Sequence, residues 1–147
     1  MRSNVSSTLP RLLAGALALT GGALAHAELI ASVPAENSRV AAPHVVKLTF
    51  GEGVELGFST FKVYPLKATG DALTLNRAAD ALMARVIGLK TDAAARADTG
   101  MSPTRGAATR ITLKLKPGLA KGTYVVMWKV LSVDTHASGG RYLFTVK

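Results

Sequence analysis

The chain has 147 residues, a formal net charge of +9 and no cysteine. This length is typical of one domain, and the lack of cysteine excludes disulfide bonds, thiolate metal sites and cysteine nucleophiles. The basic residues are scattered without a run of like charges, and aromatic residues make up only 5% of the chain. We therefore expect a solvated basic surface and no nucleic-acid partner.

The first 25 residues have the pattern of a secretory signal peptide. A short basic start is followed by an apolar run over 12–24, which is too short to span a membrane. Cleavage after Ala25 would leave a domain over 26–147 that begins with His26, whereas an overlapping cleavage pattern ends at Ala27 and would remove His26. No later apolar run approaches the length of a membrane span, so we expect export to the periplasm without membrane insertion of the mature chain.

Alternation of apolar and polar residues predicts a series of strands, with turn residues between them. The predicted strands cover 28–33, 45–50, 58–66, 110–115, 124–130 and 141–146. Short alternating strands of this kind favour an all-β fold, a Greek-key antiparallel β-sandwich or barrel of the immunoglobulin-like or cupredoxin-like type. We expect Trp128 to lie in its core.

The middle of the chain has a different pattern. Apolar residues recur at helical spacing over 76–89, which predicts one inserted helix with Thr74 or Asn76 as its cap. We expect its apolar stripe to cover one edge or opening of the sandwich. The segment 92–108 is rich in alanine, threonine and glycine and is predicted to be a polar loop.

The residues with metal-binding potential lie at the two ends of the mature chain. Asp134 and His136 are two positions apart, so in an extended segment they would point to the same face. Ser138 and the glycines that follow it would allow a tight turn directly afterwards. An N-terminal His26 could bind one metal ion through both its amino group and its ring. Nitrogen and oxygen donors in a tetragonal arrangement favour Cu(II). The pair Asp134 and His136 taken alone also fits a structural role in a turn.

Three segments resemble CopC-family copper-resistance proteins: HAELIASVPAENS at 26–38, VKLTFGE at 46–52 and GTYVVMWKVLSVDTHASGG at 122–140. The resemblance covers nearly the whole mature chain except the middle insertion. It implies a periplasmic Greek-key domain that binds one Cu(II) ion through His26, Asp134 and His136. An acidic residue of the family falls on Glu52, which the resemblance makes a weak outer ligand or a group that orients a ligand.

The sequence departs from the methionine-rich members of that family. The mature chain has only Met83, Met101 and Met127, and they are dispersed, so we expect no Cu(I) site. Met83 and Met127 are predicted to serve in packing. His44 is expected to lie in a surface loop.

Three functions are compatible with these residues. We favour a non-enzymatic carrier that sequesters copper and delivers it to an inner-membrane copper transporter of the CopD kind, a partner that the resemblance implies. A copper monooxygenase with an N-terminal histidine chelate is the enzymatic alternative. A metal-free immunoglobulin-like interaction module is the third.

Overall fold

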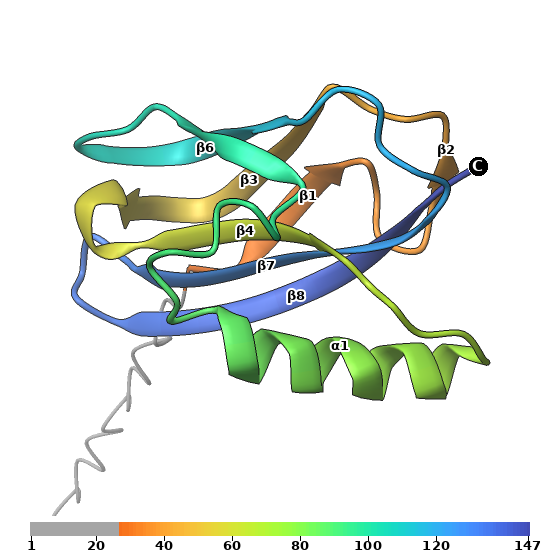
Figure 1. The fold of residues 1–147 in the computed structure, drawn as a ribbon. Helices are drawn as coiled ribbons and strands as arrows, with labels where there is room; N and C mark the ends of the chain where they lie inside the picture. Colours follow the sequence, from red (N-terminus) through yellow and green to blue (C-terminus); the bar gives the residue numbers. More distant parts are fainter. Residues whose placement is uncertain (1–26) are drawn as a thin grey trace, which may run out of the picture.

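The computed structural model describes residues 27–147, which form two four-stranded sheets packed face to face and one α-helix (Figure 1). The elements are β1 (Leu29–Val33), β2 (Arg39–Val40), β3 (Val45–Glu55), the short 3-10 helix η1 (Leu56–Phe58), β4 (Thr60–Pro65), α1 (Ala72–Val86), β5 (Asp98–Ser102), β6 (Ala107–Leu115), β7 (Gly122–Leu131) and β8 (Ala137–Val146). The strand orders are β1-β3-β6-β5 and β2-β8-β7-β4. The pairs are antiparallel except for β2, which pairs parallel with β8. The predicted β-sandwich with one inserted helix is confirmed.

The core lies between the two sheets. The inward residues of β3, Val46, Leu48 and Phe50, are each at most 1% exposed. They face the inward residues of the second sheet, among them Trp128, whose ring packs edge-on against Phe50 at 6.0 Å between centroids. Trp128 is therefore a core residue, as predicted. Burial of each such side chain contributes roughly 1.5–3 kcal/mol relative to exposure.

The helix α1 begins earlier than the apolar pattern indicated. Its N-cap is Asp71, whose carboxylate accepts a hydrogen bond of 2.8 Å from the backbone N–H of Thr74. A side-chain oxygen in this position satisfies one of the free N–H groups at a helix start. The prediction of Thr74 or Asn76 as cap was wrong because it started from the first apolar residues of the stripe and overlooked the aspartate before them.

The position of α1 also differs from the prediction. The helix lies against the outer face of the second sheet (Figure 1), and its apolar stripe there also reaches Tyr64 of the edge strand β4. It packs there on apolar side chains that point away from the main core, Val125 and Met127 of β7 and Leu143 of β8. These two strands are thus apolar on both faces, and a helix is needed to cover the outer one. Met83 and Met127 belong to this second cluster, as expected.

The predicted loop over 92–108 contains strand β5 and the first residues of β6. Met101 of β5 pairs with Leu113 of β6, so this segment forms the edge of the first sheet. An edge strand has only one neighbour and needs fewer β-branched or aromatic residues than a central strand, which is why its composition resembled a loop. Between residues 27 and 147, no helix combines the length and the apolar character that a membrane crossing requires.

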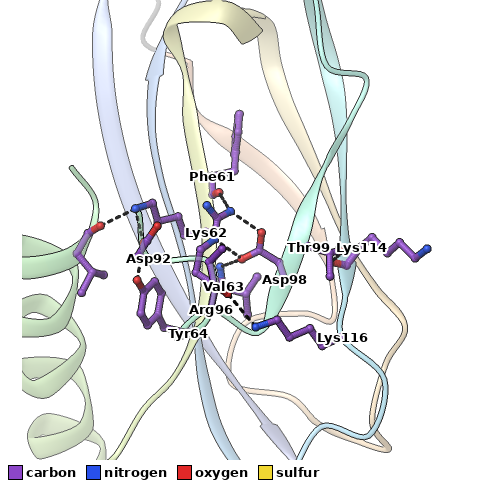
Figure 2. Close-up of polar contacts among 12 residues, drawn as sticks. Phe61, Lys62, Val63, Tyr64, Asp92, Arg96, Asp98, Thr99, Lys114 and Lys116 are labelled. Carbon is purple, nitrogen blue, oxygen red and sulfur yellow. Dashed lines mark hydrogen bonds and ion pairs between the residues drawn. The ribbon is translucent and has the colours of Figure 1, made fainter. Parts of the chain in front are cut away.

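A buried polar network ties the end of α1 to β4 (Figure 2). Lys62 is 1% exposed, and its ammonium group donates to the carbonyls of Val86 and Leu89 at 2.7 Å and to the Asp92 carboxylate at 2.6 Å. The Tyr64 hydroxyl also donates to Asp92. Burial and then this hydrogen bond raise the pKa of Tyr64 to about 12. The buried charge of Lys62 is therefore fully paired.

A second group of polar contacts joins β4 to the start of β5. The Asp98 carboxylate accepts from the Val63 N–H at 2.8 Å and forms an ion pair with Arg96. The Ala97 N–H donates to the Val63 carbonyl at 2.7 Å, and Arg96 donates to the Phe61 carbonyl at 2.9 Å. These contacts satisfy the outer edge of β4. We call this part of the sandwich, formed by β4, β5 and residues 96–98, the closed side.

Candidate metal centre

The residues expected to bind a metal lie in the turn between β7 and β8. The ladder between these strands continues to the pair Leu131 and Ala137, so only five residues form the connection. Two backbone hydrogen bonds of 2.9 Å close it, from Thr135 to the Ser132 carbonyl and from Ser132 to the His136 carbonyl. Thr135 has a φ of 72°, in the left-handed region that reverses the chain here.

This turn brings the carboxylate of Asp134 next to the ring of His136. His136 Nδ1 is 3.1 Å from Asp134 Oδ2, and both side chains are partly exposed, at 44% and 38%. The Ser132 hydroxyl donates to the other carboxylate oxygen. The hydrogen bond from Ser132, followed by that from His136, holds the pKa of Asp134 below its ordinary value. Asp134 is therefore an anionic oxygen donor at neutral pH.

The predicted convergence of Asp134 and His136 holds, but the predicted reason was wrong. The two residues meet because the chain turns through Thr135, and the segment is not extended. The residues expected to form a tight turn after His136 are paired strand residues of β8. A Cβ atom at Gly140 would come within 2.6 Å of the Trp128 ring, so this glycine makes room for the tryptophan.

The start of the described chain adjoins this turn. The Ser138 hydroxyl, two residues beyond His136, donates to the Ala27 carbonyl at 3.3 Å. Ala27 is itself buried, at 3% exposure, and belongs to the main core. His26 lies outside the described residues, but the residue that follows it is anchored beside β8.

Glu52 lies on β3, the strand that runs past the turn. The Val133 N–H donates to the Gly53 carbonyl at 3.0 Å, and Val54 forms a β-bridge with Ser132. Glu52 Oε1 is buried and has no hydrogen-bond partner among residues 27–147. The described part of the chain contains no group of three His, Asp or Glu side chains arranged to hold a metal ion, so a ligand role for Glu52 stays a prediction.

His44 is separated from this region by the length of β3. It is exposed and precedes β3, whereas the turn contacts Gly53 and Val54 near the other end of the strand. The expectation of a surface loop residue is confirmed. The residue that sequence reasoning missed is Ser132, which organises the turn and is fully buried. Its position two residues before Asp134 was the sequence signal that its hydroxyl could bond to that carboxylate.

Asp134 and His136 can supply one carboxylate oxygen and one imidazole nitrogen to the same ion. This donor pair suits a mixed nitrogen and oxygen site of the kind that Cu(II) prefers. A four-coordinate site needs two further donors. Ala27, whose carbonyl accepts a hydrogen bond from Ser138, directly follows His26 in the sequence.

Comparisons with known proteins show which family this chain resembles in sequence. Residues 29–147 match the family model described as the CopC domain. Copper resistance protein C of Escherichia coli is 33% identical over 137 residues, which cover 88% of this chain and 94% of that protein. Copper transport protein CutJ of Bacillus subtilis is 32% identical over 124 residues, which cover 83% of this chain but only 18% of that protein.

Solved structures give the same result. The crystal structure of PcoC, a methionine-rich copper resistance protein from Escherichia coli, has a TM-score of 0.58 and 29% identity, with 84% of this chain and 100% of that chain covered. The crystal structure of CopC from Methylosinus trichosporium OB3b has a TM-score of 0.53 and 28% identity, with 83% and 94% covered.

Proposed function

The chain belongs to the CopC family, and we propose that it binds copper in the periplasm and contributes to copper resistance by sequestering the ion. The observation that carries this proposal is the turn between β7 and β8, which holds Asp134 and His136 with their polar atoms 3.1 Å apart. The copper-resistance relatives supply the identity of the metal.

We propose that the ion is Cu(II) and that each chain binds one. Its ligands would be the amino group and ring of His26, together with Asp134 and His136. The hydrogen bond from Ser138 to Ala27 supports this set because it anchors the residue next to His26 beside β8. Three nitrogen donors and one oxygen donor match the preference of Cu(II) for tetragonal sites. Glu52 would act from outside this set, by orienting a ligand or by a weak contact.

A carrier passes its ion onward, and an inner-membrane transporter of the CopD kind is the partner that we propose. The match to copper transport protein CutJ supports this role. In that protein, a region similar to this chain makes up only 18% of the length, so it is part of a much longer protein whose name states copper transport. Export through the N-terminal signal peptide would place the carrier in the periplasm.

The enzymatic alternative is less well supported. Oxygen activation by a copper monooxygenase needs coordination positions that the protein leaves open. In the proposed site Asp134 lies beside His136 and would take an equatorial position. Oxygen consumption by the copper-loaded chain with a reductant would favour the enzyme, and its absence would favour the carrier.

The direct test is native mass spectrometry of the exported, processed chain after addition of one equivalent of Cu(II). We expect a chain that begins at His26 and carries one copper ion. A chain that begins at Glu28, or one that begins at His26 and stays metal-free, would contradict the proposed site.

Variants define the ligands. We expect His136→Ala, and separately one alanine added before His26, to weaken Cu(II) binding by at least about two orders of magnitude, because the first removes a nitrogen donor and the second converts the amino group of His26 into an amide. His44→Ala is the matched control, since it removes an exposed histidine at the far end of β3 and should leave the affinity unchanged. Full affinity in both ligand variants would show that the copper lies elsewhere.

A further inference from the structure

The side of the sandwich opposite the closed side carries a cavity of about 570 Å³. Leu29 and Ser32 of β1 form one wall, and Trp128 of β7 and Tyr142 of β8 form the other. A volume of this size lies in the range of sites that bind small molecules or peptide side chains. We call this region, formed by β1, β8 and the cavity between them, the open side.

The strand β1 on this side has a free edge. It is the first strand of its sheet, and within residues 27–147 it pairs only with β3. Among residues 27–147, no hydrogen bond outside that ladder involves the backbone of Leu29–Val33. Its exposed side chains include Ile30 and Val33, each 62% exposed, and it has no charged residue. Proteins usually protect edges of this kind with charges, prolines or a covering loop.

The unpaired charge around the cavity is negative. Glu28 and Glu36 line it, and neither takes part in the ion pairs formed within residues 27–147. Arg141 also lines it, but its guanidinium donates to Asp80 and to Asn76 at the helix α1. This local negative charge contrasts with the formal net charge of +9 for the whole chain.

The cavity also borders a buried polar group. Tyr142 is 2% exposed, and its hydroxyl oxygen has no close hydrogen-bond partner among the described residues, although the Ser32 side chain of β1 lies near enough for a weak one. Buried hydroxyl groups in folded proteins are normally paired, and an unpaired one commonly marks a site where a ligand or water completes the contact. The hydroxyl could donate to a carbonyl of a molecule that enters from the open side.

We propose that the open side binds an extended segment of another polypeptide, which adds as a strand to the free edge of β1 and places apolar and cationic side chains toward the cavity. Main-chain pairing gives affinity in this mode, and side-chain pockets give specificity. Cationic residues are favoured by Glu28 and Glu36. A second copy of this chain paired through its own β1 is disfavoured because Leu29–Val33 carries no cation and both copies are strongly basic.

The test is selection from a phage-displayed library of random decapeptides on the processed, copper-free chain. We expect recovery of peptides that alternate apolar residues with Lys or Arg. Amide hydrogen exchange should show that a recovered peptide, once synthesised, protects the amides of Leu29–Val33. Failure to enrich such peptides, or protection of another region, would overturn the proposal. Protection of β1 by self-association without any peptide would assign the edge to a second copy and would also overturn it.

Matched variants locate the contact. The double variant Ile30→Lys with Val33→Lys should weaken peptide binding by about tenfold or more, because it places cations on the apolar edge. Leu73→Lys, at a leucine 58% exposed on α1, is the control and should bind as the parent does. Equal weakening in both would contradict a site on β1. The variants lie outside the turn between β7 and β8, so their copper affinity should stay unchanged whether or not the proposal holds.

Discussion

The closed side and the open side of the sandwich differ in whether the outer backbone groups of their edge strands, β4 and β1, have hydrogen-bond partners. On the closed side, the outer edge of β4 is satisfied by Ala97, Arg96 and Asp98, and both charges are paired. On the open side, the edge of β1 has no such partners among the described residues, and the buried Tyr142 hydroxyl has no close hydrogen-bond partner there. An edge can thus be closed by side chains of the same chain or left available to another chain. The comparison predicts where substitutions cost stability and where they do not.

The largest expected effect is that of Asp98→Ala on the closed side. It would leave the Val63 N–H without its acceptor and the partly buried Arg96 without its counter-ion. Loss of one partner of a buried pair typically costs about 3–5 kcal/mol. We expect a decrease of this size in the free energy of unfolding, measured in urea.

Asp98→Asn serves as the control, because the amide oxygen can still accept from Val63, and it should cost clearly less than the alanine variant. A loss below about 1 kcal/mol for Asp98→Ala would mean that the edge of β4 does not depend on this carboxylate.

A smaller effect, dependent on pH, is expected for Asp92→Asn. Burial opposes the ionisation of Asp92, but the hydrogen bonds from Lys62 and Tyr64 outweigh it and lower the pKa of this carboxyl below its ordinary value of 3.8. A carboxyl with a lowered pKa in the folded state stabilises the fold above its unfolded pKa, and this contribution is lost as the pH falls through the folded value.

We therefore expect Asp92→Asn to be less stable than the parent at neutral pH, by about 1–3 kcal/mol. The difference in unfolding free energy should shrink as the pH falls below 3.8. Urea unfolding of both proteins at several pH values would measure it. A difference that stays constant down to the most acidic pH would show that the charge of Asp92 does not stabilise the network.

The smallest effect is expected for Tyr142→Phe on the open side. Burial raises the pKa of Tyr142 to about 12, and a weaker hydrogen bond from the Ser32 side chain opposes this rise. Removal of a buried hydroxyl whose nearest hydrogen-bond partner is this weak should change the free energy of unfolding by no more than about 0.5 kcal/mol. A loss above about 1.5 kcal/mol would show that the hydroxyl makes a strong hydrogen bond in solution and is not available to a ligand on the open side.

Local patterns in the sequence predicted much of this architecture. The alternation over 110–115 predicted a core strand, and Ile111, Leu113 and Leu115 are all buried in β6. Apolar residues at helical spacing from Leu75 onward predicted the helix α1, but not that it starts at Ala72. The strand β5 was missed because an edge strand that contains Asp98 and Gly100 has no apolar alternation.

The buried charges could not be predicted from local patterns. Lys62 pairs with Asp92, thirty residues further along the chain, and the Asp98 carboxylate bonds to the Val63 N–H at a separation of 35 residues. In the sequence, Lys62 alternates like an outward strand residue, and only the arrival of α1 buries it. The pair Asp134 and His136 was predictable because both residues lie within one short turn, whereas a contact of Glu52 with that pair depends on tertiary geometry.

The continuous ladder between β7 and β8 has a consequence for the thermodynamics of metal binding. The ladder fixes both ends of the five-residue turn. The helix α1 covers one face of these two strands, and their other face packs in the core. The entropy lost when Asp134 and His136 are brought together is therefore already included in the folding of the domain. An ion that binds Asp134 and His136 would therefore have to order little of this turn, so its affinity there should depend mainly on the electronic preferences of the metal.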